Sequence, residues 1–426
     1  MKVLFIVPGS GDPFYCGNCF RDNLQANALR KAGHEVVVMP LYLPLKDESF
    51  HGDTPLFFPA VSLFVSRKYF KHKVMPQWME KLLNSDWSLN MAASFSGSTS
   101  SEGLEDMTLS MINGDDSVFR KYFGMMIDWI KQHEKPEIIH LSSSLIIGIA
   151  KVIKQEIDIP VVCSLQDEEV WIDALGEYAV EAWKSIWDNV NHIDCFIASS
   201  DFYRQSVLQR TSRIKNIEVV YPGMNRAKYF SGQYPAEPTI GFFYRMNRLN
   251  GLHILAEAFV KLKKEALIPG LRLRIGGGYS DTDKKFLKKV HETLAPYESY
   301  VDWLDKYSLS SHADFYRKSS VICVPVTFDE AVGLYVCEAF ASGRPVVEPA
   351  TGSFPEIVSD GGVLYRENNS ETLAEALAKM LTTDGLWEEY CRNAVRLSQE
   401  RYSDEVLAEK LLEVYKKVMN KTNEKY

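Results

Sequence analysis

Segments typical of β-strands alternate with segments typical of α-helices along most of this chain of 426 residues. The apolar runs KVLFIV (residues 2–7) and HEVVVMP (34–40), for example, stand on either side of a helical stretch at about residues 18–32. Such a rhythm indicates a parallel sheet covered by helices on both faces, because parallel strands need long crossover connections. We therefore predict an α/β protein.

The alternation runs twice, with a break between the two runs. The break is PGMNRAKYFSGQYPAEP, a proline-rich stretch without periodicity, and it predicts a linker over residues 223–238. We expect an N-terminal domain at residues 1–222 and a C-terminal domain at residues 239–403, each a doubly wound, Rossmann-like parallel sheet. Ligands of such sheets bind beyond the carboxyl ends of the strands, so the two domains should face a common cleft. Apolar residues at helical spacing predict a final helix within residues 404–426.

Residues 50–120 interrupt this rhythm. They combine segments of helical pattern, rich in aromatic and basic residues, with the polar stretch SFSGSTSSEG. We interpret them as a helical insertion in the N-terminal domain. The basic and aromatic side chains of residues 67–78 leave two interpretations open. They could make peripheral contact with an anionic membrane surface, or they could form the solvated face of a packed helix.

Charge and cysteine content narrow the possible functions. A formal net charge of −8 argues against nucleic acid as a partner, because binding it requires a basic surface. We find no signal peptide and no apolar run of about 20 residues, so we expect a cytoplasmic protein with reduced cysteines. Cys16 and Cys19 form a CxxC pair, which leaves a tight turn, a redox role or a metal site open.

Two carboxylates stand eight positions apart in EAVGLYVCE, directly after the buried-strand pattern SSVICVPV. A segment with the pattern of a helix follows. We therefore expect Glu330 in the loop after a strand, Gly333 at a helix N-terminus and Glu338 inside the helix. The N–H groups around Val332, Gly333 and Leu334 would then form an anion site, which a ligand can approach closely at the glycine. A plain strand–helix connection with both Glu side chains in water is the other interpretation.

This segment resembles the signature of the retaining glycosyltransferases of family 4, which have the two-domain GT-B fold. EAVGLYVCEAFASGRPVV is similar to the family pattern E-G-F-G-L-x-x-L-E-A-M-A-x-G-x-P-V-V, and GSFPEIV is similar to G-G-x-P-E-I-V. GFFYRMNRLNGLHILAEAFVKL is similar to G-R-L-x-x-x-K-G-x-x-x-L-I-E-A-F, and VVYPGMNRAKYF to V-I-x-N-G-V-D-x-x-x-F. Ala331, Val332 and Ser353 depart from the first two patterns.

The resemblance implies how a nucleotide-sugar donor would bind. Glu338 would accept hydrogen bonds from both hydroxyls of the ribose. The amides of Val332, Gly333 and Leu334 would hold the diphosphate. Glu330 would reach the sugar ring or stabilise the positive charge that develops at its anomeric carbon.

The family also supplies an Arg and, five residues later, a Lys, which together neutralise the leaving diphosphate. Arg245 stands at the Arg position, but Asn250 stands at the Lys position and carries no charge. Arg248 could replace the missing cation, or it could be a solvated loop residue.

Two glycines and one histidine complete the predicted donor site. Gly277 ends the strand LRLRIGG, and Gly17 lies in the turn PGSGDPFYCGN, which lacks the third glycine of an NAD-binding fingerprint. His140, in IIHLSS, matches a family histidine of the interdomain cleft that contacts the donor sugar, with a buried structural histidine as the alternative. Gln166 stands where the family has a second histidine.

We therefore expect a retaining, metal-independent hexosyltransferase without a cofactor. It would move a sugar from a nucleotide-sugar donor to a glycan, lipid-linked or small-molecule acceptor. The resemblance implies front-face attack, in which the leaving phosphate, held by Arg245 and the Gly333 amide, takes the proton of the acceptor. A non-catalytic GT-B protein that binds a nucleotide-sugar or a glycan is an alternative that Asn250 favours, and an epimerase on the same fold is another. In the family, the final helix, here within residues 404–426, returns to the N-terminal domain.

Overall fold

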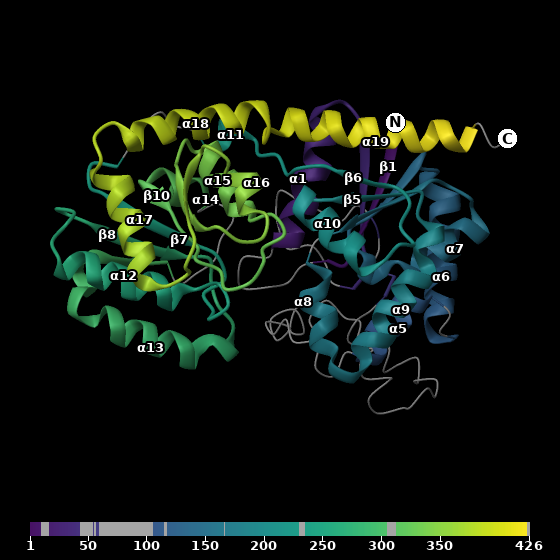
Figure 1. Cartoon of the computed structure of the whole chain (residues 1–426). Coiled ribbons are helices and arrows are strands. Elements are labelled where there is room, and N and C mark those ends of the chain that lie inside the picture. The colour runs from purple at the N-terminus through teal and green to yellow at the C-terminus, as the bar shows by residue number, and fades with distance from the viewer. Residues whose placement is uncertain are drawn as a thin grey trace.

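The computed structural model of the chain describes residues 1–9, 17–42, 54, 57–58, 105–114, 117–165, 167–229, 235–304 and 312–423 (Figure 1). Within these residues the strands form two six-stranded sheets, one in each half of the sequence. The strand pairs of both sheets are parallel. The prediction of an α/β protein with two doubly wound parallel sheets is confirmed.

The first sheet has the order β2-β1-β3-β4-β5-β6. Its strands are β1 (Lys2–Val7), β2 (Glu35–Pro40), β3 (Ile138–Leu141), β4 (Val161–Leu165), β5 (Cys195–Ala198) and β6 (Ile217–Val219). The second sheet has the order β12-β11-β10-β7-β8-β9. Its strands are β7 (Thr239–Phe243), β8 (Arg272–Gly276), β9 (Val301–Trp303), β10 (Val321–Ile322), β11 (Val346–Pro349) and β12 (Gly362–Tyr365).

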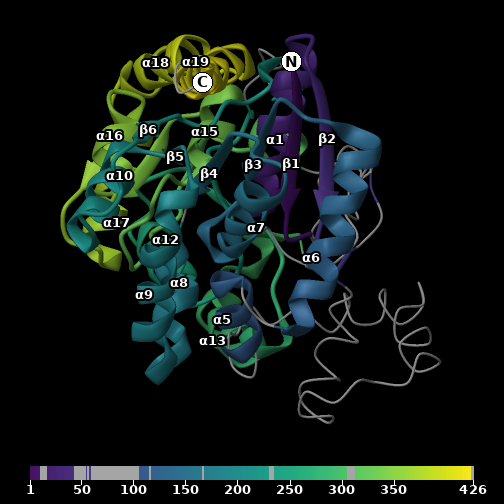
Figure 2. The same cartoon turned by 90° about the vertical axis from the view of Figure 1, so that its right-hand side faces the viewer.

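Helices connect the strands and cover the sheets (Figures 1 and 2). Those of the first half are α1 (Gly17–Lys31), α5 (Glu105–Asn113), α6 (Ser117–Trp129), α7 (Gly148–Glu156), α8 (Glu168–Ile172), α9 (Ala179–Asn189) and α10 (Asp201–Arg210). The second half has α11 (Arg226–Tyr229), α12 (Leu252–Lys264), α13 (Lys284–Leu294), α14 (His312–Arg317), α15 (Leu334–Ala341), α16 (Phe354–Val358), α17 (Ser370–Thr382) and α18 (Leu386–Glu400). The last helix is α19 (Asp404–Asn423).

The side chains of β1 show why helices are needed on both faces of the first sheet. Val3, Phe5 and Val7 pack with buried residues of α1 and α19. Leu4 and Ile6 belong to the cluster that includes residues of α5, α6, α7 and α9. Successive strand residues point to opposite faces, so an uninterrupted apolar strand is stable only when both faces are buried.

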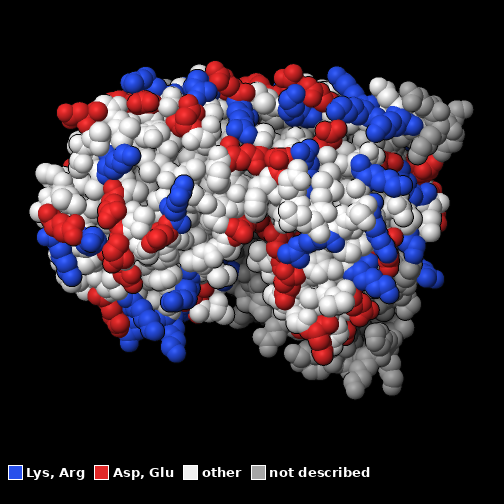
Figure 3. Space-filling model, in the orientation of Figure 1, with Lys and Arg blue, Asp and Glu red and all other residues white. Residues whose placement is uncertain are grey.

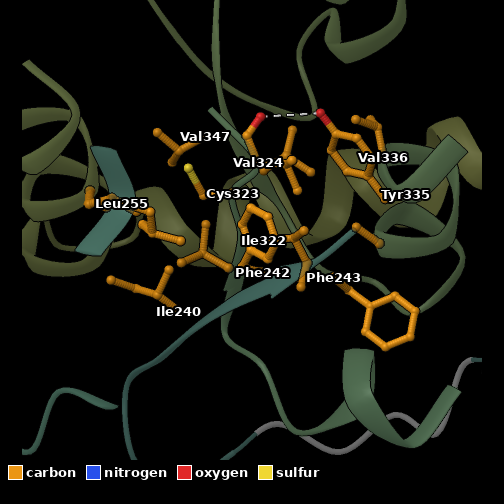
Figure 4. Packing of buried hydrophobic residues seen from close by; sticks show 14 of the residues in the cluster. Ile240, Phe242, Phe243, Leu255, Ile322, Cys323, Val324, Tyr335, Val336 and Val347 are labelled. Carbon is orange, nitrogen blue, oxygen red and sulfur yellow. Dashed lines mark hydrogen bonds between the residues drawn. The ribbon is translucent and has the colours of Figure 1, made fainter. Parts of the chain in front are cut away.

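The second sheet is buried in the same way. Ile240 and Phe242 of β7 pack with Ile322 of β10 in one cluster (Figure 4). Tyr335 of α15 belongs to this cluster, and its hydroxyl donates to the Val324 carbonyl oxygen at 3.3 Å. The first turn of α15 is thereby attached to the segment that leaves β10.

The last helix joins the two halves. α18 belongs to the second half, whereas α19 runs over the first half and contacts α1 (Figure 1). Lys31 of α1 forms ion pairs with Asp404 at 3.0 Å and with Glu405 at 2.6 Å. The chain therefore crosses between the halves twice, and an isolated bridge between Met224 and Ser403 connects the two crossings.

Two stretches are more ordered than the sequence suggested. Part of the predicted linker forms α11, where Tyr229 is buried and its hydroxyl donates to Glu338 at 2.8 Å. α5 falls inside the predicted insertion, yet Met111 and Ile112 belong to the core of the first half. The membrane contact considered for residues 67–78 lies outside the described residues.

The described part of the chain contains no helix that is both long and apolar enough to cross a membrane. On the face shown in Figure 3, Lys and Arg side chains are interspersed with Asp and Glu over both halves.

Candidate active site

The second sheet changes direction between two central strands. From β7 the chain moves to β8 and β9 on one side, and from β10 it moves to β11 and β12 on the other. Ligands of doubly wound sheets bind beyond the carboxyl ends of the strands at such a point. Arg245 follows β7 and Glu330 follows β10, so the fold brings these two predicted catalytic residues to that position.

Glu330 is a buried carboxylate at the N-terminus of α15, with 1% of its surface exposed. Burial raises its pKa, and hydrogen bonds that it accepts from three backbone N–H groups act in the opposite direction. The donors are Gly333, Val332 and Ala331. The Tyr244 hydroxyl lies 3.4 Å from Glu330 Oε2. The helix N-terminus attracts an anion, and here that anion is a side chain of the same chain.

The Glu330 carboxylate lies beside the predicted anion site. The N–H groups of Val332 and Gly333 lie close enough to this carboxylate to lower its pKa. Gly333 has a φ of 62°, and a Cβ at this position would lie 2.8 Å from the Phe354 ring. Leu334 begins α15, and its side chain is buried, as is that of Val332.

Arg245 is also held by an internal partner. Its guanidinium lies 3.0 Å from the Asp283 carboxylate and donates to the Ser280 hydroxyl at 2.9 Å. Ser280 and Asp283 form a capping box at the start of the helical segment that leads into α13. The positive charge predicted to neutralise a diphosphate is thus paired with a carboxylate in this conformation.

Asn250 makes a contact that the family pattern did not indicate. It is 4% exposed, and its Nδ2 donates to the Arg245 carbonyl oxygen at 2.8 Å. The Asn250 backbone N–H donates to the Asn247 side chain at 2.8 Å. Asn250 therefore braces the loop that carries Arg245, and Arg248 is exposed on the same loop.

The two predicted glycines lie at element ends. Gly277 has a φ of 110°, and a Cβ there would lie 2.3 Å from the Tyr244 carbonyl oxygen, so the glycine permits close contact between the ends of β7 and β8. Gly17 is the first residue of α1. Gln166 and Cys16 lie outside the described residues.

Glu338 lies inside α15 and has no exposed surface. A ligand therefore cannot reach its carboxylate in this conformation. Its Oε1 accepts from the Tyr229 hydroxyl and lies 2.8 Å from His312 Nδ1, and its Oε2 accepts from the Tyr316 hydroxyl at 2.9 Å. A ribose could bind Glu338 only by displacing one of these partners.

His140 is a core residue of the first half. It has no exposed surface, and its ring nitrogens lie 2.7 Å from the Tyr415 hydroxyl and 2.8 Å from Ser164 Oγ. Burial lowers its pKa to about 3, and the nearby Arg21 guanidinium acts in the same direction. The structure therefore matches the alternative of a buried structural histidine. Its partner Ser164 lines a small cavity between the two halves of the protein.

Hydrogen bonds hold the two halves together beside α15. The Ser200 hydroxyl of the first half donates to the Ala331 carbonyl oxygen of the second. The backbone N–H groups of Asp201 and Phe202, at the start of α10, donate to the Glu356 carboxylate at 2.8 and 2.9 Å.

A small cavity lies at this junction. Its walls include Arg21, Gln25, Ser164 and Ser199 from the first half and Val332 and Leu334 from the second. Arg21, Asp22 and Gln25 of α1 were not among the predicted site residues, although FRDNLQ contains a signal for them. It places Arg21, Asp22 and Gln25 at positions that the fold buries, where an amphipathic helix carries apolar residues.

Arg21 reaches across the end of the first sheet. Its guanidinium donates to Asp22 Oδ1 at 2.9 Å and to the Ser142 carbonyl oxygen after β3. Burial raises the pKa of Asp22 to about 6, and the charge of Arg21 opposes this rise.

The two parallel sheets meet near the carboxyl ends of their strands, and a helix at the end of the chain crosses between the halves. This arrangement is that of the GT-B fold. Residues 237–383 match the model of the family described as glycosyl transferases group 1. This part of the chain is therefore similar to that family.

Curated relatives match over part of their length. The D-inositol 3-phosphate glycosyltransferase of Kribbella flavida is 38% identical over 217 residues, which cover 47% of this chain and 50% of the relative. The enzyme of the same name from Corynebacterium glutamicum is 28% identical over 225 residues, or 51% of each chain. The chain thus spans about half the length of the curated relatives it matches.

Solved structures match over nearly the whole chain. Sucrose-phosphate synthase from Thermosynechococcus elongatus has a TM-score of 0.68 at 17% identity, with 99% of this chain and 100% of that chain covered. Anabaena Alr3699/HepE in complex with UDP-glucose has a TM-score of 0.65 at 15% identity, with 98% and 100% covered. These likenesses confirm the predicted GT-B architecture.

Proposed function

We propose that this chain is a retaining glycosyltransferase, which transfers a hexosyl group from a nucleotide-sugar to a glycan, lipid-linked or small-molecule acceptor. The position of Glu330 carries the proposal. It is a buried carboxylate on the N-terminus of α15, beyond β7 and β10 and beside the junction with the first half. A nucleotide-sugar brings to this place an anion, which the helix attracts, and an anomeric carbon that gains positive charge during transfer.

We propose a uridine nucleotide as the first donor to test. The HepE structure contains UDP-glucose, and a structure of TarM from S. aureus contains UDP. The curated relatives are named for D-inositol 3-phosphate, which makes that compound the first acceptor to test.

Donor binding would exchange internal anions for the diphosphate. The diphosphate would replace the Glu330 carboxylate at the amides of Val332 and Gly333, which would release Glu330 toward the sugar. Arg245 would exchange Asp283 for the diphosphate, because its guanidinium suits either anion. The helix N-terminus and the Arg245 guanidinium would thus be neutralised both before and after binding.

The same groups support transfer without a metal ion. As the bond to the sugar breaks, the charge on the diphosphate would be met by Arg245 and the first amides of α15. The phosphate oxygen would then take the proton of the acceptor on the same face, which retains the anomeric configuration.

A non-catalytic GT-B protein that binds a nucleotide-sugar is the second candidate. The ion pair between Arg245 and Asp283 favours it, as does the uncharged Asn250 in the place of a cation. Such a protein would bind the donor without consuming it.

A two-stage assay separates these candidates. First, the melting temperature is measured with UDP-glucose, UDP-N-acetylglucosamine, GDP-mannose and ADP-glucose, since a ligand that binds the folded state raises it. The best donor is then incubated with and without D-inositol 3-phosphate, and released nucleotide diphosphate is measured. Release supports the transferase. A raised melting temperature without release supports the binding protein, and no shift with any donor overturns both.

A further inference from the structure

Two buried polar atoms in the wall of the junction cavity make no hydrogen bond within the fold. Gln25 Oε1 and Ser199 Oγ are buried and have no hydrogen-bond partner among the described residues. The exposed fractions of the two residues are 3% and 4%. A buried polar atom without a partner lowers stability, so native proteins keep few of them, and those few need an explanation.

The side chains of Arg21 and Ser164 in this wall do have hydrogen-bond partners. Arg21 is held by Asp22 and the Ser142 carbonyl oxygen, and Ser164 Oγ contacts His140. Arg21 therefore adds a fixed guanidinium beside the two unpartnered atoms. An apolar residue at position 25 would pack against Val332 and Leu334 without this cost.

The cavity is too small for a ligand in this conformation. Its volume of about 10 Å³ is at the lower limit for a single water molecule. A sugar ring could enter only if the two halves separated at this seam. The hydrogen bond from Ser200 to Ala331 directly adjoins both walls, because these residues follow Ser199 and precede Val332.

We propose that Gln25 and Ser199, beside Arg21, form a hydroxyl-binding wall on the first half, which positions a sugar when the halves open and close around it. The proposal rests on the proposed function and names residues of the same site. Gln25 Oε1 can only accept hydrogen bonds, so its partner must carry a proton. A sugar hydroxyl supplies one, whereas an ionised phosphate does not.

The hydroxyls could belong to either of two sugars in the reaction. One is the sugar of the donor, and the other is a hydroxylated acceptor. Binding of UDP-glucose compared with UDP reports on the first, and the KM of D-inositol 3-phosphate reports on the second. UDP lacks the transferred sugar, so its binding should not depend on this wall.

The test uses Gln25→Met and Ser199→Ala, which remove the polar atoms and nearly conserve volume. Ser342→Ala is the matched control, because Ser342 Oγ is also buried without a partner but lies at the other end of α15. We expect each wall variant to bind UDP-glucose, or to use D-inositol 3-phosphate, roughly five- to tenfold less well, as for a lost hydrogen bond. Affinity for UDP should stay unchanged, and the melting temperature of the free protein should stay equal or rise.

Two results would overturn the proposal. One is a lower melting temperature of the free wall variants with unchanged UDP-glucose affinity and acceptor KM, which would give these atoms a structural role. The other is an equal effect of Ser342→Ala on binding. If the wild-type protein bound no nucleotide-sugar at all, the proposed function would fall first and this proposal with it, so the two failures are distinguishable.

Discussion

Glu338 accepts hydrogen bonds from Tyr229 and Tyr316 and contacts His312, all in the core of the second half. Glu338→Gln keeps the shape but loses the charge that these donors share. We expect it to lower the free energy of unfolding by about 1–3 kcal/mol, because a charged and buried acceptor is lost. Tyr229→Phe is the matched variant, since it removes one hydrogen-bond donor from Oε1 and keeps the carboxylate.

Urea unfolding measures the first effect, and calorimetry with UDP tests the ribose role. If a ribose replaces Tyr229 at Glu338, Tyr229→Phe should bind UDP as well as or better than the wild type, while Glu338→Gln binds it less well. Unchanged UDP affinity in Glu338→Gln would leave Glu338 as a structural residue alone.

Glu348 of β11 is a second buried carboxylate, and it makes stability depend on pH. Burial raises its pKa well above the ordinary 4.5, and the nearby Glu330 adds to this rise. The folded state thus keeps a proton that the unfolded chain has lost, so stability is highest below the unfolded pKa and falls as pH rises toward the folded one. Its Oε1 accepts from the Val324 N–H at 3.1 Å, and Oε2 lies 3.3 Å from the Tyr335 hydroxyl.

Glu348→Gln mimics the protonated acid at every pH. We therefore expect it to raise the free energy of unfolding at pH 8 and to change it little at pH 4, with about 1.4 kcal/mol for each unit of raised pKa. Urea unfolding at the two pH values checks this. The same change at both would show that the charge of Glu348 is not the cause.

Single residues differed in how well the sequence predicted them. Glu330 and Gly333 lie where the strand–loop–helix pattern placed them, because local sequence sets those positions. The environments of Glu338 and His140 depend on Tyr229 and Tyr415, which are distant in sequence, so spacing gave no sign that both would be buried and bonded. Gln25 likewise shares a cavity with Val332 and Leu334, which are distant in sequence.

The loop after β7 is an element in which one side chain fixes the backbone. Asn250 is buried and donates to the Arg245 carbonyl oxygen. Asn250→Lys would restore the charge of the family pattern but place an ammonium group in a buried position. We expect a loss of about 1–3 kcal/mol in the free energy of unfolding, and no gain in turnover.

Arg248→Ala is the control for this loop, because Arg248 is exposed and its loss should change stability by less than about 0.5 kcal/mol. Thermal unfolding and donor turnover are measured for both variants. Faster turnover in Asn250→Lys at unchanged stability would contradict this expectation. It would mean that a positive charge at position 250 assists transfer and that the Asn250 hydrogen bond is not needed to hold the loop.

Most elements could be predicted because apolar strands and helical periodicity are local signals. β1 matches its expected range, and α15 begins directly after Gly333, where a helix N-terminus was expected. α11 was not expected, since a single turn has no periodicity and depends on the burial of Tyr229. α5 was assigned to an insertion because its packing against α7 and α9 cannot be read from its own sequence.

At the scale of the whole molecule, Glu356 connects the two halves. Its carboxylate accepts from the first amides of α10 and from the Tyr221 hydroxyl. Glu356→Ala removes these bonds, so we expect the closed arrangement to become less populated and turnover to fall by roughly tenfold. Small-angle X-ray scattering should then give a larger radius of gyration for the free protein.

Glu405→Ala is the control for closure. Glu405 pairs with Lys31 between α19 and α1, away from the seam beside α15, so its loss should leave turnover and radius unchanged. Equal behaviour of the two variants would show that Glu356 does not control closure.

We propose that Glu330 serves the transfer of a sugar from a nucleotide-sugar with retention of the anomeric configuration. The most direct measurement follows UDP-α-glucose and its sugar product by proton NMR, with wild type and Glu330→Gln compared. We expect an α-configured initial product from the wild type. In Glu330→Gln we expect a rate lower by roughly 10²–10³-fold, because the charge facing the anomeric carbon is lost. We expect an equal or higher affinity for UDP, because a neutral amide competes less with the diphosphate for the N-terminus of α15. A β-configured product, or full activity in Glu330→Gln, would contradict the proposal.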